Sequence, residues 1–166
     1  MATTNPQLRP IRSADNPAIA AIIRTVMPEF GASGPGFAIN DDEVDCMYET
    51  YSQPGSRYFV IADGSQVLGG GGIAPLSAVD PDQPTTCELR KMYSLPEVRG
   101  HGFGRQMLTT CLTAARELGY QRCYLETLTG MNAAQHLYQR FGFEKLCGPL
   151  GKTGHFSCDR YYLLEL

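Results

Sequence analysis

The stretch that decides the fold covers residues 95–105, LPEVRGHGFGR, which directly follows a strand pattern and opens a helical one. Its three glycines stand at alternate positions, Gly100, Gly102 and Gly104. Without side chains in this turn, successive backbone N–H groups can point into one concavity at the positive end of a helix dipole. Arg99 and Arg105 flank the turn and can add charge-assisted contacts. The stretch indicates an anion cradle, although a tight turn also needs glycine without any ligand.

Glycine spacing argues against two common nucleotide-binding motifs. Residues 148–154, GPLGKTG, end like a Walker A loop, but that loop needs glycine five positions before Gly151, where this chain has Leu146. The dinucleotide fingerprint G-x-G-x-x-G belongs to an early strand-helix-strand unit, whereas the glycines here follow G-x-G-x-G late in the chain. An enzyme that binds ATP or NAD in one of these ways is therefore disfavoured.

Outward from this stretch, apolar periodicity and turn residues predict alternating strands and helices. The expected strands cover residues 8–12, 57–61, 66–74, 86–94, 121–128, 143–147 and 158–164. The expected helices cover residues 17–27, a short segment near 41–51, 103–118 and 134–141. Asn16 should cap the first helix, and Asp63-Gly64 should turn an antiparallel hairpin. The strand, helix and strand from 86 to 128 imply a right-handed crossover with parallel pairing, so the fold class is mixed α/β.

Two glycine- or proline-rich segments interrupt this pattern. Four consecutive glycines, residues 69–72, indicate a bulge or a close strand crossing, with the approach of a ligand as the alternative. Residues 75–84, PLSAVDPDQP, indicate an exposed connection.

The composition of the 166 residues fits one compact domain over 1–166, because 43% are hydrophobic and no repeat or long linker divides them. A formal net charge of −3 gives no basic surface for nucleic-acid phosphates. The six cysteines form no CxxC pair, and no stretch approaches the roughly 20 apolar residues of a membrane helix. The amino terminus also lacks an apolar signal region, so we expect a cytoplasmic protein without nucleic-acid or membrane partners.

Two motifs in this order resemble those of one enzyme family. The family's pyrophosphate motif R/Q-x-x-G-x-G/A matches Arg99, Gly102 and Gly104, after a strand, ELRKMYSL, that looks like its central splayed strand. Its second motif, A-x-x-L-Y-x-x-x-G-F, matches Ala134, Leu137, Tyr138, Gly142 and Phe143. Over nearly its whole length the chain is similar to the GCN5-related N-acetyltransferase (GNAT) superfamily. The resemblance implies a mixed, mostly antiparallel central sheet with a parallel splayed strand pair and flanking helices, a GNAT-like acyl-CoA N-acyltransferase fold.

The resemblance also implies acetyl-CoA as co-substrate, and no metal. The implied cofactor-binding residues are Met92, Tyr93, Ser94, Arg99, Gly100, His101, Gly102, Phe103, Gly104, Arg105 and Asn132. The backbone of residues 92–94 would pair with the pantetheine arm as an added strand and polarise the thioester carbonyl, while residues 99–105 would bind the pyrophosphate. Many family members place asparagine seven residues before the tyrosine, where this chain has Met131 and puts Asn132 one position later.

Tyr138 occupies the position from which family tyrosines commonly protonate the departing thiolate. A thiolate with a reference pKa of about 8.5 leaves more easily when a positioned donor with a pKa of about 10 supplies its proton. Helical periodicity alone would also allow a core aromatic side chain here. The position relative to Gly142 and Phe143 favours the acid role.

The acceptor amine must be neutral to attack, so the site needs a base or a water chain. Glu88 is the first candidate for this base, and Glu126 on the parallel neighbour is the second. Strand alternation would place Glu88, Arg90 and Met92 on one face, so a structural ion pair is the alternative role of Glu88. Further candidates are the imidazoles of His101 and His155. An acyl-cysteine route needs a histidine partner that the sequence does not identify, so direct attack is preferred.

The resemblance thus implies an N-acetyltransferase that moves an acetyl group from acetyl-CoA to a primary amine. The alternative is a non-catalytic acyl-CoA-binding module that senses the cofactor or docks on a partner. The acceptor, a small molecule or a peptide amine, is not identified by the sequence because acceptor loops vary on a common scaffold. Family habit suggests a homodimer. By analogy with the family's substrate walls, the expected acceptor contacts are Glu29, Phe30, Phe37, Asp159 and Tyr161.

Overall fold

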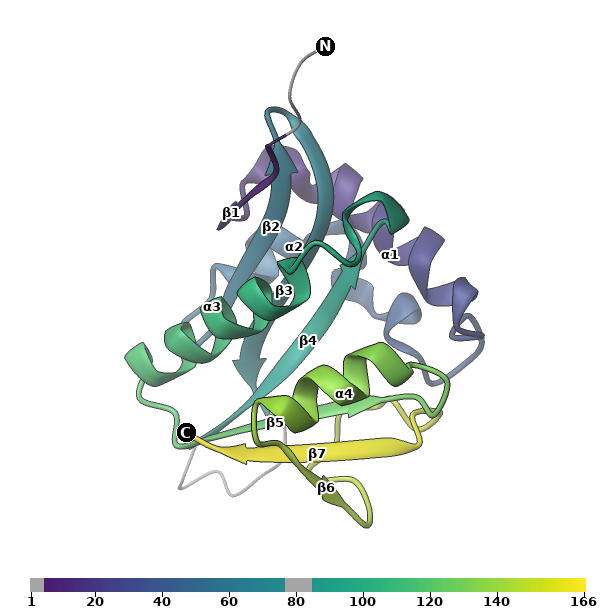
Figure 1. Ribbon diagram of the computed structural model, residues 1–166, viewed down its shortest axis with the longest axis vertical. Coiled ribbons are helices and arrows are strands. Elements are labelled where there is room, and N and C mark those ends of the chain that lie inside the picture. Colours follow the sequence, from purple (N-terminus) through teal and green to yellow (C-terminus); the bar gives the residue numbers. More distant parts are fainter. Residues whose placement is uncertain (1–4, 77–84) are drawn as a thin grey trace.

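A seven-stranded sheet forms the centre of the protein in the computed structural model, which describes residues 5–76 and 85–166 (Figure 1). Its strands lie in the order β1-β2-β3-β4-β5-β7-β6. Their bounds are β1 Gln7–Pro10, β2 Arg57–Asp63, β3 Gln66–Pro75, β4 Thr86–Ser94, β5 Arg122–Thr127, β6 Glu144–Leu146 and β7 Arg160–Glu165. Within the described sheet, β4 and β5 run parallel and the other neighbouring pairs are antiparallel. The mixed α/β class and the parallel pair predicted from the sequence are confirmed, whereas most of the predicted 75–84 connection, residues 77–84, lies outside the described residues.

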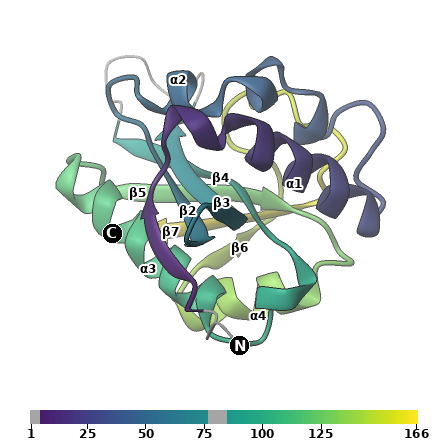
Figure 2. The same cartoon turned by 90° about the horizontal axis from the view of Figure 1, so that it is seen from above.

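Helices cover both faces of the sheet (Figure 2). Their bounds are α1 Asn16–Glu29, α2 Met47–Tyr51, α3 Phe103–Glu117 and α4 Asn132–Arg140. The buried side chains of α1 and α2 belong to one hydrophobic cluster, and those of α3 and α4 belong to another on the opposite face. Each large aliphatic side chain buried in this way contributes about 1.5–3 kcal/mol, so the apolar helix stripes hold both layers in place. None of the helices in the described ranges combines the length and apolar character that crossing a membrane requires.

The start of α1 differs from the sequence-based expectation. Asn16 is the first residue of α1 and not its cap, which is Asp15. The Asn16 side chain instead reaches α2: its Oδ1 accepts a hydrogen bond from the Tyr48 N–H at 2.8 Å, and its Nδ2 donates to Glu49 Oε2 at 2.7 Å. The capping prediction is wrong because this amide joins two helices.

The four glycines of β3 allow the helical layers to approach the sheet closely. A Cβ on Gly70 would lie 2.6 Å from the Tyr58 ring, and one on Gly71 would lie 2.9 Å from Met107 Cγ. The Tyr58 hydroxyl, buried under this strand, donates a hydrogen bond to the Lys91 carbonyl at 2.7 Å. The predicted bulge or close strand crossing is confirmed as a shift of register between Gly70 and Gly72, with the extra residue in β4. The missing side chains of the glycines make room for Tyr58 and Met107.

A bulge in β4 changes which side chains share a face. Two residues of β4 oppose the single Gly71 of β3, and the first of them, Lys91, has a φ of 49°. Because the bulge shifts the alternation, Met92 packs with the cluster under α3, whereas Glu88 and Arg90 lie on the face of α2. The prediction that Glu88, Arg90 and Met92 point together is wrong for Met92.

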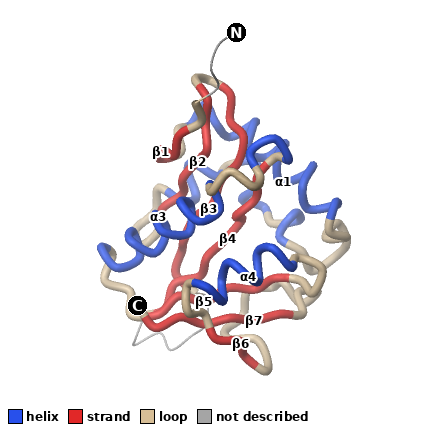
Figure 3. The backbone as a smooth tube through the Cα atoms, in the orientation of Figure 1, coloured by secondary structure: helices blue, strands red, loops and turns tan. Residues whose placement is uncertain are grey.

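The parallel strands β4 and β5 pair over three residues only and then diverge (Figure 3). The last paired residues are Glu88 and Tyr124. From residue 89 to Ser94, no described strand pairs with the edge of β4 that faces β5. The divergence leaves backbone N–H and C=O groups of β4 available to a ligand in extended conformation.

Candidate active site

The turn before α3 forms one wall of a long groove. Gly100 and Gly102 have φ values of 77° and 85°, in the left-handed region that glycine enters without strain. Gly102 is the N-cap of α3, and a Cβ placed on either glycine would meet no atom within 4 Å. The turn thus leaves open space above the first N–H groups of α3, at the positive end of its dipole.

Arg99 is held beside this turn with one donor unused. Its Nε donates to the Ser94 carbonyl at 2.9 Å, and its Nη1 donates to Glu29 Oε2 at 2.9 Å. The guanidinium lies 5.9 Å from the centre of the Phe30 ring. Its Nη2 is buried and finds no hydrogen-bond acceptor among the described residues. An anion in the groove would supply the missing acceptor.

The groove gathers most of the residues that the sequence assigned to cofactor binding. Those that line it are Met92, Tyr93, Ser94, Arg99, Gly100, Gly102, Gly104, Arg105 and Asn132. His101 is exposed and Phe103 packs against the cluster under α3, so the side chains of these two are not part of the wall. A volume of about 1090 Å³ makes the groove large enough for a ligand of nucleotide size.

A second space, the inner cavity, continues the groove between β4 and β5. The groove and the inner cavity share the lining residues Phe30, Met92, Tyr93 and Met131. The other apolar lining residues are Met27, Ala32, Phe37, Ala38, Leu89, Leu125, Leu128 and Tyr138, and the polar ones are Lys91, Glu126, Thr127 and Cys158. Of the expected acceptor contacts, the structure places Phe30 and Phe37 in this wall and Glu29, Asp159 and Tyr161 outside it.

Tyr138 enters the inner cavity from α4. Its side chain is buried, and its ring lies 5.8 Å from that of Phe143 and 6.1 Å from that of Tyr162, centre to centre. Burial raises the pKa of the Tyr138 phenol above its ordinary value of 10. The phenol therefore keeps its proton at neutral pH in the wall of the inner cavity.

The two carboxylates singled out from the sequence stand on neighbouring strands in different surroundings. Glu88 is 2% exposed, forms an ion pair with Arg90, and has a raised pKa because burial outweighs that pair. Glu126 lines the inner cavity, and its two oxygens accept hydrogen bonds from the Tyr124 and Thr153 hydroxyls, each at 2.7 Å. Glu88 is not part of the inner cavity's wall.

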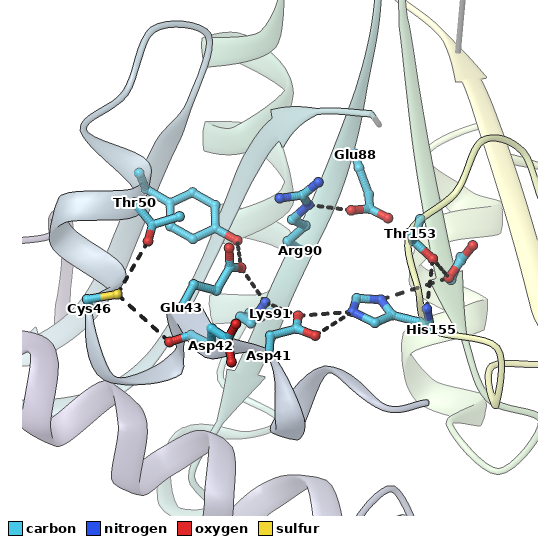
Figure 4. A network of polar contacts seen from close by, with 12 residues as sticks. Asp41, Asp42, Glu43, Cys46, Thr50, Glu88, Arg90, Lys91, Thr153 and His155 are labelled. Carbon is cyan, nitrogen blue, oxygen red and sulfur yellow. Dashed lines mark hydrogen bonds and ion pairs between the residues drawn. The ribbon is translucent and has the colours of Figure 1, made fainter. Parts of the chain in front are cut away.

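A polar cluster extends from these carboxylates to the segment before α2 (Figure 4). The Nε2 of His155 lies 2.9 Å from Asp41 Oδ2, and its Nδ1 lies 3.9 Å from Glu126 Oε2. Lys91, whose side chain is 1% exposed, donates to Asp41 at 2.7 Å and also contacts Glu43. Sequence reasoning named His155 but missed Asp41 and Lys91, because Asp41 and His155 are 114 positions apart and no local spacing connects them.

Three of these groups have the chemistry of metal ligands. One ligand atom from each of Glu88, Glu126 and His155 lies within 4.8 Å of the others. The carboxylates already accept hydrogen bonds from protein groups, including Arg90 and Thr153, and the permanent charge of Arg90 stands beside Glu88. The arrangement fits a hydrogen-bonded network better than a metal-ion site.

The Asp41 contact makes His155 a measurable reporter of this cluster. Burial lowers the pKa of His155, but the hydrogen bond to Asp41 and the charges of Asp41 and Glu88 raise it more, against an opposing effect of Lys91. We expect the imidazole to titrate above 6.5 in the wild type and at a lower pH in Asp41→Asn, as followed by NMR of the histidine ring signals. His101 and His136 are internal controls, and an unchanged His155 titration in the variant would contradict the contact.

The contact between His155 and Asp41 also makes the free energy of unfolding depend on pH. The pKa of His155 is raised in the folded state. Its contribution to the free energy of unfolding is therefore complete below the unfolded-state pKa of about 6.5 and is lost as the pH rises through the folded-state pKa. The pKa of Asp41 is lowered, since His155 and Lys91 outweigh its burial, so this carboxylate stays ionised over that range. The difference in free energy of unfolding between wild type and Asp41→Asn should therefore be larger at pH 6 than at pH 9.

Comparison with known proteins identifies the family of proteins that has this fold and to which the chain belongs. The family model of the acetyltransferase (GNAT) family matches residues 19–143. The chain belongs to this family, which confirms the resemblance drawn from the two sequence motifs.

Individual proteins similar to this chain are also named acetyltransferases. The chain is 42% identical over 167 residues to the uncharacterized N-acetyltransferase YjgM of Escherichia coli (strain K12), covering 100% of this chain and 98% of that protein. An N-acetyltransferase of Staphylococcus aureus Mu50 has a TM-score of 0.78 at 23% identity, covering 98% of this chain and 99% of that one. A GNAT superfamily phosphinothricin acetyltransferase of Sinorhizobium meliloti, solved in complex with acetyl-CoA, has a TM-score of 0.76 at 18% identity and covers 97% of this chain and 88% of that one. These structural likenesses establish the shared fold.

Proposed function

We propose that the protein transfers the acetyl group of acetyl-CoA to a primary amine. The observation that carries this proposal is that the groove and the inner cavity meet beside the unpaired edge of β4 and that Tyr138 lines the inner cavity. Membership of the acetyltransferase family supports it, as does the complex of the Sinorhizobium meliloti neighbour with acetyl-CoA.

The residues of the groove fit acetyl-CoA. The open turn at Gly100 and Gly102 and the unused Nη2 of Arg99 suit its pyrophosphate. The backbone of residues 92–94 suits the amides of the pantetheine arm, because this edge of β4 has no described strand partner. The thioester would then lie where the groove meets the inner cavity.

In the proposed reaction, the groove holds the acetyl donor and the inner cavity holds the acceptor amine. Acetyl-CoA supplies an activated acetyl thioester. The neutral acceptor amine attacks the thioester carbonyl carbon from the inner cavity, so that a C–N bond forms and the C–S bond breaks. Tyr138 donates its phenolic proton to the departing sulfur, and the second proton that the nitrogen loses on becoming an amide returns the phenolate to the phenol. The proton that the ammonium form of the amine must lose goes to a carboxylate.

We assign this proton to Glu126, since its carboxylate lines the inner cavity, whereas that of Glu88 contacts Arg90 outside the wall. Glu126→Gln should lower turnover about tenfold at pH 7, and the loss should shrink as pH rises because more of the amine is already neutral. Glu88→Gln is the matched isosteric control and should lower turnover less. The role of Glu88 as the base stays a prediction from the sequence. A larger loss of turnover in Glu88→Gln than in Glu126→Gln would assign the base to Glu88.

Calorimetric titration with acetyl-CoA tests the donor half of the proposal. We expect dissociation in the micromolar range for acetyl-CoA and no binding of NAD or ATP. Release of the free CoA thiol in the presence of a broad amine panel tests the transfer. Binding without release above background for any amine would favour a non-catalytic acyl-CoA-binding module, and absence of binding by the folded protein would overturn both functions.

A further inference from the structure

The charges around the inner cavity do not balance. The contacts of the polar cluster connect four carboxylates, Asp41, Glu43, Glu88 and Glu126, to two permanent cations, Arg90 and Lys91, and to His155. When all four carboxylates are ionised, negative charge exceeds positive charge by one even with His155 protonated. Burial raises the pKa of Glu88, so the excess is reduced where Glu88 holds a proton. A buried group of charges with excess negative charge favours the arrival of a cation.

Glu126 is where this cation would be stabilised most. Asp41 and Glu43 both contact Lys91, and Glu88 contacts Arg90. Among the four carboxylates, Glu126 has no lysine or arginine partner in the described residues; its hydrogen bonds come from two neutral hydroxyls, and His155 stands at 3.9 Å. Its side chain is 4% exposed and lines the inner cavity, so a ligand cation there would be largely desolvated.

Most of the other residues that line the inner cavity are apolar, and the remaining polar ones are Lys91, Thr127 and Cys158. Aliphatic, thioether and aromatic side chains from α1, from the loop that follows it and from the end of β5 form the wall, namely Met27, Phe30, Phe37, Ala38, Leu128 and Met131. Lys91, the one permanent cation in this wall, is already in contact with Asp41 and Glu43. The inner cavity has a volume of about 50 Å³, enough for an ammonium and the first part of a hydrocarbon stem that extends into the adjoining groove. Its described cations have no free capacity for a carboxylate beside that ammonium.

We infer that the acceptor is a primary amine on an apolar stem that carries no carboxylate next to the amino group, with its ammonium held by Glu126. This inference rests on the proposed function and narrows it. Alkyl- and arylalkylamines belong to the accepted class, and so do amines separated by a hydrocarbon stem from the rest of a larger molecule. Free α-amino acids are excluded, because their carboxylate would lie beside the Glu126 carboxylate, and Lys91 is already paired with Asp41 and Glu43.

Pairs of acceptors that differ only in the carboxylate test the inference. The pairs are 2-phenylethylamine against L-phenylalanine and n-butylamine against L-norvaline, with the neutral L-phenylalaninamide as the rescue compound. With acetyl-CoA as donor and CoA thiol release as the measurement, kcat/KM should be about 100-fold higher for each amine than for its amino acid, and the amide should recover most of the difference. The amino group of each amino acid is less basic than that of the matching amine, so a larger share of it is neutral and able to attack. This difference alone would favour the amino acids, so it cannot produce the expected preference for the amines.

A binding measurement separates ammonium recognition from catalysis. With the protein saturated with CoA instead of acetyl-CoA, 2-phenylethylamine is titrated calorimetrically into wild type, Glu126→Gln and Asp159→Asn. Glu126→Gln should weaken binding about tenfold. Asp159→Asn is the control, since that carboxylate is outside the inner cavity and accepts hydrogen bonds from Thr129, and it should bind as the wild type does.

The outcomes distinguish the inference from the function on which it rests. Equal use of an amine and its amino acid, or unchanged amine binding by Glu126→Gln, would overturn the inference while transfer itself stands. Absence of thiol release for these compounds while another amine of the broad panel is acetylated would overturn the inference alone. Binding of acetyl-CoA without thiol release for any amine of the panel would remove the proposed function and the inference together.

Discussion

Gly102→Val should raise the dissociation constant for acetyl-CoA by about 100-fold. The side chain would occupy the open space above the first N–H groups of α3, where we propose that the pyrophosphate binds. It would also be forced to a φ near 85°, which costs a β-branched residue about 1–2 kcal/mol. Calorimetric titration of the purified variant measures the change.

Gly119→Val is the control that separates these two effects. Gly119 follows the other end of α3 and has the same φ of 85°, and a Cβ placed on it would likewise meet no atom within 4 Å. It lies outside the groove, so the variant should lose a similar amount of stability and keep its affinity for acetyl-CoA. Equal affinities of the two variants would show that residues 99–102 are only a turn.

Tyr138→Phe should reduce kcat by about 100-fold or more while the dissociation constant for acetyl-CoA stays within about twofold of the wild type. The variant removes the proton donor for the departing thiolate and leaves the aromatic packing with Phe143 and Tyr162 intact. The measurements are steady-state thiol release and calorimetry.

Tyr162→Phe is the matched control, because Tyr162 is buried next to Tyr138 and its hydroxyl donates to Gln135 Oε1 at 2.8 Å, away from the inner cavity. Its kcat should change little. Unchanged turnover in Tyr138→Phe would remove this residue from the acid role, and equal losses in both variants would point to packing as the cause.

The parts of the site that sequence predicts are those made by contiguous residues. The glycine turn is visible because left-handed backbone at Gly100 and Gly102 and an open helix start both depend on local chemistry. The strand before it and the helix after it follow from apolar periodicity, and the structure has them as β4 and α3. Tyr138 is found through the family motif that also matches Gly142 and Phe143, which follow it closely in the chain, so no tertiary information is needed.

The parts that sequence misses depend on tertiary contacts or on a single backbone irregularity. Asp41 reaches His155 only because the segment before α2 and the loop before β7 lie over the same end of the sheet. The bulge at Lys91 breaks the two-residue alternation on which the orientation of Met92 depended. Asn16 has the right residue type for a cap, but a partner on α2 competes successfully for its amide.

The glycines of β3 have a bearing on how mutational data for this enzyme should be interpreted. A Cβ on Gly72 would lie 2.5 Å from the Arg57 carbonyl oxygen and 2.5 Å from Tyr58 Cδ2, and Tyr58 in turn holds the carbonyl of Lys91 at the bulge. Because β3 has no side chains at these positions, it packs closely between β2 and β4, and this close packing sets the position of the β4 edge that faces the groove. If substitutions at these four glycines lower activity in a saturation scan, the cause would be displacement of the neighbouring main chain. The glycines themselves line neither the groove nor the inner cavity.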